Sequence, residues 1–325
     1  MTAADKTARI VFLDRSTIPA VIKLNPPPIP HELIVHEETA PDQVAARIAD
    51  ADVVITNKVR LGRAEIAAAP GLRMIAVAAT GYDVVDLDAC KERGIVVSNI
   101  RNYAVHTVPE HTFALIFALR RSLIPYRQSV VDGRWQRAGT FCYFDYPISD
   151  LAGSTLGVIG DGVLGKSVAD IARAIGMTVL FSTYKGVEGM GPLYTPYEDV
   201  LRQSDIITLH LPLMPSTRNL IGPADFALME RKPLLINTAR GGLVDEQALC
   251  DALRSGQISG AGFDVVTSEP PPADHPFMKL LELPNFILTP HVAWASTEAI
   301  QGLTDQLMEN IALFWQGKPR NVVSA

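Results

Sequence analysis

The sequence predicts an α/β protein made of two doubly wound parallel sheets, and three observations carry this prediction. Short apolar runs alternate along the chain with amphipathic stretches, and Val/Ile/Leu-rich strands that alternate with helices indicate parallel sheets covered on both faces. The chain has 325 residues, which is long for one hydrophobic core and natural for two domains. A glycine-rich turn near residue 160 then opens a second alternating series.

The first series of elements fills roughly the first hundred residues. Helical spacing of apolar residues is expected at 41–48, 63–69 and 86–93. Between these helices, short apolar runs predict strands at 10–13, 33–35, 53–56, 74–78 and 95–98. Together they predict one small doubly wound unit.

The second series begins after a long helical pattern that starts near Asn102, with Pro109 in its first turn. An aromatic-rich segment follows at 135–146. The predicted strands of this series are 154–159, 177–181, 206–209, 234–236, 260–265 and 286–288. A last helical pattern, 297–315, has no sheet of its own left to cover, so we expect it to return to the first domain. The expected domains are therefore 1–101 plus 290–325, and 102–289.

Composition restricts the class of protein. The net charge is -6 with a pI near 5.7, and no basic tract appears, which argues against nucleic acid as the main partner. Three widely spaced cysteines, Cys90, Cys142 and Cys250, favour a reducing compartment and lack metal-ligand spacing. The longest apolar stretch, around 113–119, is too short to span a bilayer. We expect a cytoplasmic protein without a metal or a membrane anchor.

The glycine turn satisfies two nucleotide-binding patterns at once. Gly160, Gly162 and Gly165 match G-x-G-x-x-G, in which a tight bend brings the backbone close to the pyrophosphate of a dinucleotide. Gly160 and Gly165 followed by Lys166 and Ser167 also match the phosphate loop of NTPases. Both patterns place phosphate on the amides of a helix N-terminus, so this segment alone does not decide between them.

The flanking strands favour the dinucleotide pattern without settling the choice. A dinucleotide fold predicts a second strand about twenty residues on that ends in an acid for the adenosine ribose. That strand is expected at 177–181, but it ends in Ser182, Thr183, Tyr184 and Lys185, with no acid. A phosphate-loop enzyme instead needs an apolar strand that ends in a magnesium-binding Asp. No strand supplies one, because Asp264 is expected within the 260–265 run.

Chemically useful side chains follow several strands of the second series. Ligands of open α/β sheets bind beyond the carboxyl ends of the strands. By this criterion Arg240, Glu269, His210 and His291 stand out, since each comes shortly after a predicted strand. One edge of the predicted sheet thus carries a guanidinium, a carboxylate and an imidazole. These groups suit the binding and protonation of a small oxoacid.

Four motifs in this second series carry a family resemblance. They are Gly160-Asp161-Gly162-Val163-Leu164-Gly165, Asn237-Thr238-Ala239-Arg240-Gly241-Gly242, Gly262-Phe263-Asp264-Val265 through Glu269-Pro270, and Thr289-Pro290-His291. With these motifs in order, the sequence resembles the D-specific 2-hydroxyacid dehydrogenases over nearly the whole chain, and within them the glycerate dehydrogenase or hydroxypyruvate reductase branch. Four motifs in register are far more specific than one. They favour the dinucleotide interpretation and make the Lys166-Ser167 match a coincidence.

The resemblance implies a Rossmann cofactor domain inserted in a flavodoxin-like substrate domain, and an enzyme that transfers a hydride between NAD(P)H and a small 2-oxoacid. Glyoxylate and hydroxypyruvate are the expected substrates, and the product is the D-2-hydroxyacid where a stereocentre forms. The resemblance also implies a homodimer built on the cofactor domains, with the aromatic arm at 135–146 reaching toward the partner.

Residue roles follow from the resemblance by position. It implies that Arg240 binds the substrate carboxylate, His291 gives the carbonyl its proton and Glu269 pairs with His291. It places the amides near Thr80 and Gly81 at the substrate carboxylate and Asp264 at the nicotinamide carboxamide. Trp294, three residues after His291, is a further candidate substrate residue that would limit substrate size. The full set of expected cofactor contacts is Gly160, Gly162, Val163, Leu164, Gly165, Ser182, Thr183, Lys185, His210, Pro212, Thr238, Ala239, Arg240, Asp264 and His291.

The departure at Thr183 predicts the cofactor preference. Relatives that prefer the unphosphorylated cofactor carry an acid there, and Thr183 removes the charge that would repel a 2'-phosphate. Ser182, Tyr184 and Lys185 are then available to contact that phosphate. We therefore expect NADPH to be used at least as well as NADH.

Plainer interpretations compete with several of these roles. Taken alone, His291 is a surface histidine, Arg240 a loop cap and Glu269 a solvated acid. Lys185 is as easily a solvated lysine as a phosphate ligand, and Trp294 is as easily hinge core as a limit on substrate size. Two other functions also fit the fold: a corepressor-like protein that senses NAD(H), and a phosphate-loop NTPase. The combined Arg240, Glu269 and His291 set disfavours both.

Overall fold

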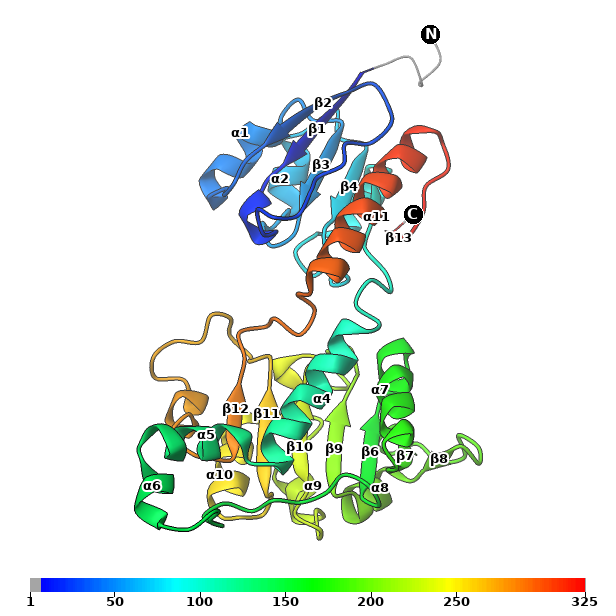
Figure 1. The fold of residues 1–325 in the computed structure, drawn as a ribbon. Coiled ribbons are helices and arrows are strands. Elements are labelled where there is room, and N and C mark those ends of the chain that lie inside the picture. The colour runs from blue at the N-terminus through cyan, green and yellow to red at the C-terminus, as the bar shows by residue number, and fades with distance from the viewer. Residues whose placement is uncertain (1–6, 325) are drawn as a thin grey trace. The chain divides into compact units, whose positions relative to one another are not determined.

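The chain is described here from residue 7 to residue 324, as a computed structural model (Figure 1). The described residues form two compact units. The first contains the described residues up to Tyr103 together with those from Ala295 onward, and the second contains Ala104–Trp294. The chain therefore passes between the units after Tyr103 and again after Trp294.

The first unit contains a six-stranded sheet in the order β13-β5-β4-β3-β1-β2. All neighbouring strands pair in parallel except β13, which pairs antiparallel with β5. The strands are β1 (Ala8–Phe12), β2 (His31–Val35), β3 (Val53–Thr56), β4 (Met74–Val77), β5 (Val96–Ser98) and β13 (Val322–Ser324).

Helices pack on both faces of this first sheet. Helices α1 (Val44–Ile48), α2 (Arg63–Ala67) and α3 (Leu87–Glu92) contribute buried side chains to one cluster that also contains Ile75 and Val77 of β4. Met74 and Ala76 are equally buried and point to the opposite face of the strand. Helix α11 (Thr297–Trp315) packs against β4 and covers them. The C-terminal helix therefore belongs to the first unit, as expected from its lack of a sheet.

The second unit contains a seven-stranded, wholly parallel sheet in the order β12-β11-β10-β9-β6-β7-β8. The strands are β6 (Thr155–Ile159), β7 (Thr178–Ser182), β8 (Tyr194–Thr195), β9 (Ile206–Leu209), β10 (Leu234–Asn237), β11 (Gly260–Phe263) and β12 (Phe286–Leu288). From β6 the chain proceeds to β7 on one side and later to β9 on the other. The strand order therefore reverses at β6, and ligands of such sheets bind beyond the carboxyl ends at this point.

Two layers of helices sandwich the second sheet. Helices α4 (Thr107–Arg120) and α7 (Val163–Ala174) pack together and share one core cluster with the sheet. Helices α8 (Tyr197–Gln203), α9 (Pro223–Ala227) and α10 (Glu246–Arg254) contribute to the cluster on the other face. Helices α5 (Leu123–Val131) and α6 (Arg134–Ala138) follow α4 (Figure 1). Short 3-10 segments occur at η2 (Arg15–Thr17), η3 (Pro41–Gln43), η4 (Gly241–Leu243) and η5 (Pro276–Leu280).

Side-chain caps fix where several helices begin. Asp86 accepts the Ala89 amide at the start of α3, and Asp245 accepts the Ala248 amide at the start of α10. Ser296 caps α11 in the same way, directly after the second passage between units. Such a cap satisfies an amide that has no partner within the helix and contributes roughly 1 kcal/mol. The loops before these helices are thereby held at defined positions.

The predicted fold class is confirmed, and several details of the prediction were wrong. The long helix begins at Thr107 rather than near Asn102, whose φ is +57°. The strand expected at 260–265 ends at Phe263, and the side chain of the next residue, Asp264, accepts backbone amides from residues 292 and 293. Strands β8 and β13 were not anticipated at all. Among residues 7–324, no helix has both the length and the apolar character needed to cross a membrane.

Candidate active site

The glycine turn lies at the carboxyl end of β6, where the strand order reverses. Gly160 has φ of +108°, and a Cβ there would lie 2.4 Å from the His210 carbonyl oxygen. A Cβ on Gly165 would lie 2.0 Å from the Gly160 carbonyl oxygen. These two glycines are therefore required by a tight bend and by close helix packing, which are the roles that a dinucleotide turn assigns to them.

The N-terminus of α7 fits a pyrophosphate. Gly162 precedes the first helical residue, Val163, and a Cβ on Gly162 would meet nothing within 4 Å. A ligand can therefore approach the backbone closely at this position. The first amides of a helix have no acceptor within the helix, and its dipole favours negative charge there. With twelve residues, α7 is long enough to supply that dipole.

The end of β7 differs from what the sequence led us to expect. Ser182 and Thr183 are buried: the Ser182 hydroxyl donates to the Thr183 carbonyl at 2.6 Å, and Thr183 Oγ1 accepts the Tyr197 amide at 3.0 Å. Lys185 Nζ donates to both carboxylate oxygens of Asp225, at 2.6 and 2.8 Å, and to the Leu220 carbonyl at 3.0 Å.

These contacts use all three donors of the Lys185 ammonium group. The expectation that Lys185 contacts a 2'-phosphate is therefore not supported, since its charge is already neutralised by a buried carboxylate. Tyr184 remains half exposed beside it.

His210 lies at the carboxyl end of β9, next to the glycine turn. Its amide donates to the Ile159 carbonyl at 2.8 Å, which ties this end of β9 to β6. Its Nε2 lies 2.9 Å from the Thr208 hydroxyl. Desolvation lowers the pKa of His210 to about 4, so the imidazole is neutral near pH 7. A neutral ring suits a structural or cofactor-lining role rather than proton donation. Pro212, two residues further on, is exposed.

Arg240 follows β10 in a turn that Asn237 holds in place. The Asn237 side chain donates to the Arg240 carbonyl at 2.8 Å and accepts the Ala239 amide at 3.0 Å. The Thr238 hydroxyl lies 3.0 Å from that of Thr112 on α4. The half-buried Arg240 guanidinium donates to the Ala239 carbonyl at 2.7 Å, which uses one of its five N–H donors.

A glycine brings the Arg240 loop against the loop that carries Glu269. A Cβ on Gly241 would lie 2.0 Å from the Val266 carbonyl carbon and 2.3 Å from its oxygen. Only the absence of a side chain allows this approach. The Val266 amide in turn donates to Glu269 Oε1 at 3.2 Å. The loops after β10 and β11 are thus packed backbone to backbone.

Glu269 and His291 form the pair that the resemblance implied. His291 Nδ1 lies 2.6 Å from Glu269 Oε2, and the two side chains are 31% and 36% exposed. A carboxylate on Nδ1 fixes the orientation of the ring. Nε2 is then the ring nitrogen that can pass a proton to a ligand.

Asp264 lies at the end of β11 with its side chain wholly buried. Its Oδ1 accepts the Thr289 hydroxyl at 2.5 Å and the Val292 amide at 3.0 Å, while Oδ2 accepts the Ala293 amide at 2.8 Å. His111 of α4 lies against the same group, with Nε2 3.0 Å from Thr289 Oγ1. The sequence predicted no role for His111, nor one for Thr289, although Thr289 belongs to the Thr289-Pro290-His291 motif.

The expected substrate residues fall in different units. Thr80 and Gly81 belong to the first unit, where the Thr80 hydroxyl donates to the Ile100 carbonyl at 2.9 Å and the Thr80 carbonyl accepts the Asn99 side chain at 2.8 Å. Trp294 is the last residue of the second unit, and its indole donates to the His291 carbonyl at 2.9 Å.

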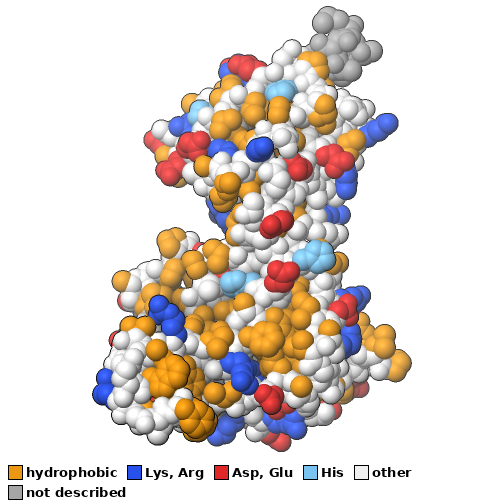
Figure 2. All heavy atoms as spheres, viewed as in Figure 1, with side chains coloured by type: hydrophobic (Ala, Val, Ile, Leu, Met, Phe, Trp, Pro, Cys, Tyr) orange, Lys and Arg blue, Asp and Glu red, His pale blue; other side chains and the backbone are white. Residues whose placement is uncertain are grey.

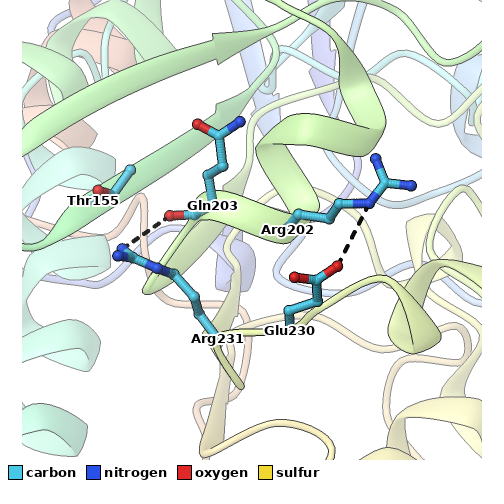
Figure 3. Close-up of a pocket in the computed structure, with 5 residues that line it drawn as sticks. All are labelled: Thr155, Arg202, Gln203, Glu230 and Arg231. Carbon is cyan, nitrogen blue, oxygen red and sulfur yellow. Dashed lines mark hydrogen bonds and ion pairs between the residues drawn. The ribbon is translucent and has the colours of Figure 1, made fainter.

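A separate hollow occurs at the opposite edge of the second sheet, where the strands begin (Figure 3). Its lining consists of Thr155, Arg202, Gln203, Glu230 and Arg231. Arg202 lies 3.8 Å from Glu230, and Arg231 donates to the Gln203 carbonyl at 3.2 Å and to the Asp205 carboxylate at 3.0 Å. Its charges are compensated, and it holds none of the expected site residues. No group of His, Cys, Asp or Glu within residues 7–324 has the arrangement of a metal site.

Comparison with known proteins decides the family. Residues 113–293 match the model of the D-isomer specific 2-hydroxyacid dehydrogenase NAD binding domain. The glycerate dehydrogenase of Methylorubrum extorquens is 52% identical over 321 residues, which cover 98% of this chain and 100% of that protein. The chain belongs to the D-isomer specific 2-hydroxyacid dehydrogenase family.

One further relative and one solved structure are also similar to this chain. The hydroxypyruvate reductase of Blautia hydrogenotrophica is 38% identical over 299 residues, 90% of this chain and 92% of that protein. A solved structure of an acyclic imino acid reductase, in complex with NADPH and D-Arg, superposes with a TM-score of 0.81 at 29% identity, covering 97% of this chain and 99% of that one. The chain is thus an oxidoreductase with an NAD-type cofactor domain, and neither a phosphate-loop NTPase nor a corepressor is favoured.

Proposed function

We propose that this dehydrogenase uses NAD(P)H to reduce a small 2-oxoacid, glyoxylate or hydroxypyruvate, to the 2-hydroxyacid, which is the D-isomer where a stereocentre forms. The pairing of His291 with Glu269 carries the proposal: Glu269 orients the imidazole, and the loop that leads to Glu269 packs against the loop that bears Arg240. The names of the relatives, glycerate dehydrogenase and hydroxypyruvate reductase, support the substrate class.

Each of these side chains has one task in the reduction. Arg240 binds the substrate carboxylate, since a guanidinium matches a carboxylate in a two-pronged geometry. His291 donates a proton from Nε2 to the carbonyl oxygen, and Glu269 holds Nδ1 and stabilises the imidazolium before transfer. When bound, the nicotinamide supplies the hydride that reduces the carbonyl carbon. The oxoacid thereby gains a hydride and a proton and becomes the alcohol, while the cofactor is oxidised.

The remaining contacts divide between cofactor and substrate. The turn with Gly160, Gly162 and Gly165 binds the pyrophosphate. The first-unit residues Thr80 and Gly81 contribute backbone amides to the substrate carboxylate, and Trp294 limits substrate size. The further cofactor contacts are Val163, Leu164, His210, Pro212, Thr238, Ala239 and Asp264.

A panel of 2-oxoacids with both reduced cofactors tests this function. The near-ultraviolet absorbance of NADH or NADPH is expected to fall on addition of glyoxylate or hydroxypyruvate, and kcat/KM is expected to be lower for bulkier oxoacids. Chiral analysis of the glycerate formed from hydroxypyruvate is expected to give the D-isomer. Absence of oxidation with every oxoacid, in protein that binds the cofactor, would contradict the proposal.

The preference for cofactor belongs to the same proposal: NADPH is used at least as well as NADH. Its support is the neutral Thr183 at the end of β7, where an acid would repel the 2'-phosphate. Lys185 takes no part, because it is paired with Asp225. Thr183→Asp is expected to lower kcat/KM for NADPH on the order of tenfold, a loss of about 1.4 kcal/mol in transition-state binding, with little change for NADH. A strong NADH preference of the unmodified protein would refute this part.

The proposal also includes the assembly and the location of the enzyme: a homodimer formed through the second unit, in the cytoplasm. Apolar side chains are exposed on and after α5 and α6: Leu123, Ile124, Val131, Trp135, Phe141 and Phe144. Figure 2 shows hydrophobic side chains gathered over this region. Phe141 and Phe144 are 90% and 83% exposed, and exposed aromatic side chains of this kind support an interface with a partner subunit. A monomer in light scattering at micromolar concentration would dismiss the dimer, and recovery of the protein outside the cytosolic fraction would dismiss the location.

A further inference from the structure

His111 on α4 lies against the group that holds the proton donor's loop. Its Nε2 is 3.0 Å from Thr289 Oγ1 and 3.7 Å from Asp264 Oδ1. The three residues come from α4, from the end of β11 and from the segment after β12. His111 and Thr289 are 178 residues apart in the chain. Their contact therefore joins the helix that opens the second unit to the segment that closes it.

Counting protons fixes the direction of these hydrogen bonds. The Thr289 hydroxyl has one proton, and its oxygen lies 2.5 Å from the buried Asp264 carboxylate. An ionised carboxylate only accepts, so the hydroxyl must donate to it. The Thr289 oxygen is then an acceptor toward His111, and His111 Nε2 must carry a proton. His111 thus orients the hydroxyl toward Asp264.

Asp264 in turn holds the backbone around His291 by hydrogen bonds. Besides the Thr289 hydroxyl, its carboxylate accepts the amides of Val292 and Ala293, at 3.0 and 2.8 Å. Its carbonyl accepts the His291 amide at 2.8 Å. His291 itself has φ of +54°, a conformation that costs a non-glycine residue energy and persists only where its surroundings enforce it.

We propose that His111 is a positioning residue for the proposed proton donor His291, acting through Thr289 and Asp264. The inference rests on the proposed function, because it concerns the placement of His291 during proton transfer. His111 fixes the direction of the Thr289 hydroxyl. This hydroxyl and two backbone amides together occupy most of the acceptor sites of the Asp264 carboxylate. These contacts hold the backbone at 291–293 in one strained conformation.

The test compares His111→Leu, which removes the His111–Thr289 hydrogen bond, with Thr289→Val, which removes that bond together with the one from Thr289 to Asp264. Both substitutions change the side-chain volume little. Both are expected to lower kcat and kcat/KM for the 2-oxoacid together, on the order of tenfold, while the Kd for NADH stays unchanged, because the positioning matters only during the reaction. His111→Gln retains a side-chain N–H donor and is expected to recover part of kcat. The double variant is expected to be no worse than the poorer single variant, because both act on one chain of contacts.

Hydrogen exchange provides a readout that does not need activity. In His111→Leu and Thr289→Val, the amides of 291–293 are expected to exchange faster than in the unmodified protein. His106→Leu, on the exposed turn before α4, is the matched control and is expected to change neither exchange nor kcat. The inference would be overturned if both variants kept the amide exchange rates at 291–293 or the kcat of the unmodified protein. It would also be overturned if the loss of kcat in the double variant equalled the combined losses of the two single variants. Failure of the proposed function is distinct, since it would appear as His291-independent turnover or as no turnover in the unmodified protein.

Discussion

Replacing Gly241 by alanine tests whether the close approach of two loops creates the active site. Gly241 directly follows Arg240, and its backbone lies on that of Val266 in the loop that leads to Glu269. An added Cβ would lie 2.0 Å from the Val266 carbonyl carbon. Two carbon atoms in van der Waals contact are about 3.5 Å apart at the closest. The loops must therefore separate by about 1.5 Å, and the obstacle is backbone, which cannot rotate away.

Both stability and activity are expected to suffer from this separation. Overpacking of this kind costs roughly 1–3 kcal/mol, and each kcal/mol lowers the Tm of a unit of this size by about 2–4 °C. A displacement of about 1 Å between catalytic groups costs on the order of a hundredfold in rate. We therefore expect Gly241→Ala to retain its fold at room temperature and to lose about a hundredfold in kcat/KM.

Thermal unfolding and 2-oxoacid reduction, measured on the same preparations, check this prediction. Gly302→Ala is the matched control, because a Cβ there meets nothing within 4 Å and the residue lies in the exposed face of α11. Alanine in a helix interior is roughly 0.5–1 kcal/mol more favourable than glycine, so this control should raise Tm and leave kcat/KM unchanged. A Gly241→Ala protein with the kcat/KM of the unmodified enzyme would refute the reasoning.

Two further predictions concern stability. Asp225→Asn leaves the Lys185 ammonium without its carboxylate; because that lysine is partly exposed, we expect a loss of about 2 kcal/mol in urea unfolding, and a loss below about 0.5 kcal/mol would contradict the pairing. Desolvation lowers the pKa of His210 from 6.5 to about 4 in the folded protein, so between these pH values the unfolded chain takes up a proton and the folded protein does not. The neutral His210 therefore contributes about 3 kcal/mol to the free energy of unfolding. This contribution is fully present above pH 6.5 and is lost as the pH falls toward 4. Urea unfolding from pH 7 to pH 4 should show this slope, and His210→Asn should flatten it; equal slopes in both proteins would refute the assignment.

Much of the fold was predictable because most strands are buried on both faces. The runs at Val53–Thr56, Ile206–Leu209 and Phe286–Leu288 were predicted to the residue, since a continuous apolar run bounded by polar residues has few alternatives. Strands β8 and β13 have two and three residues. Their sequences carry no periodicity, and only pairing with β7 and β5 makes them strands.

The candidate site was predictable where strand ends alone place a residue. The glycine turn, Arg240 and the Glu269–His291 pair follow strands of one sheet, and parallel strands bring their carboxyl ends to one edge. Lys185 was misjudged because its partner Asp225 lies 40 residues away on α9, with β8, α8 and β9 between them in the chain. No role could be predicted for His111 and Thr289, because their contact depends on how α4 packs on the sheet.

The central claim, that His291 donates the proton to a 2-oxoacid, is tested most directly by His291→Ala. Cofactor oxidation with glyoxylate or hydroxypyruvate should be followed together with the Kd for the reduced cofactor. General acid–base catalysis contributes roughly 10²–10⁴-fold, so we expect kcat/KM to fall by at least about a hundredfold while cofactor binding is retained. Turnover close to that of the unmodified enzyme would contradict the account.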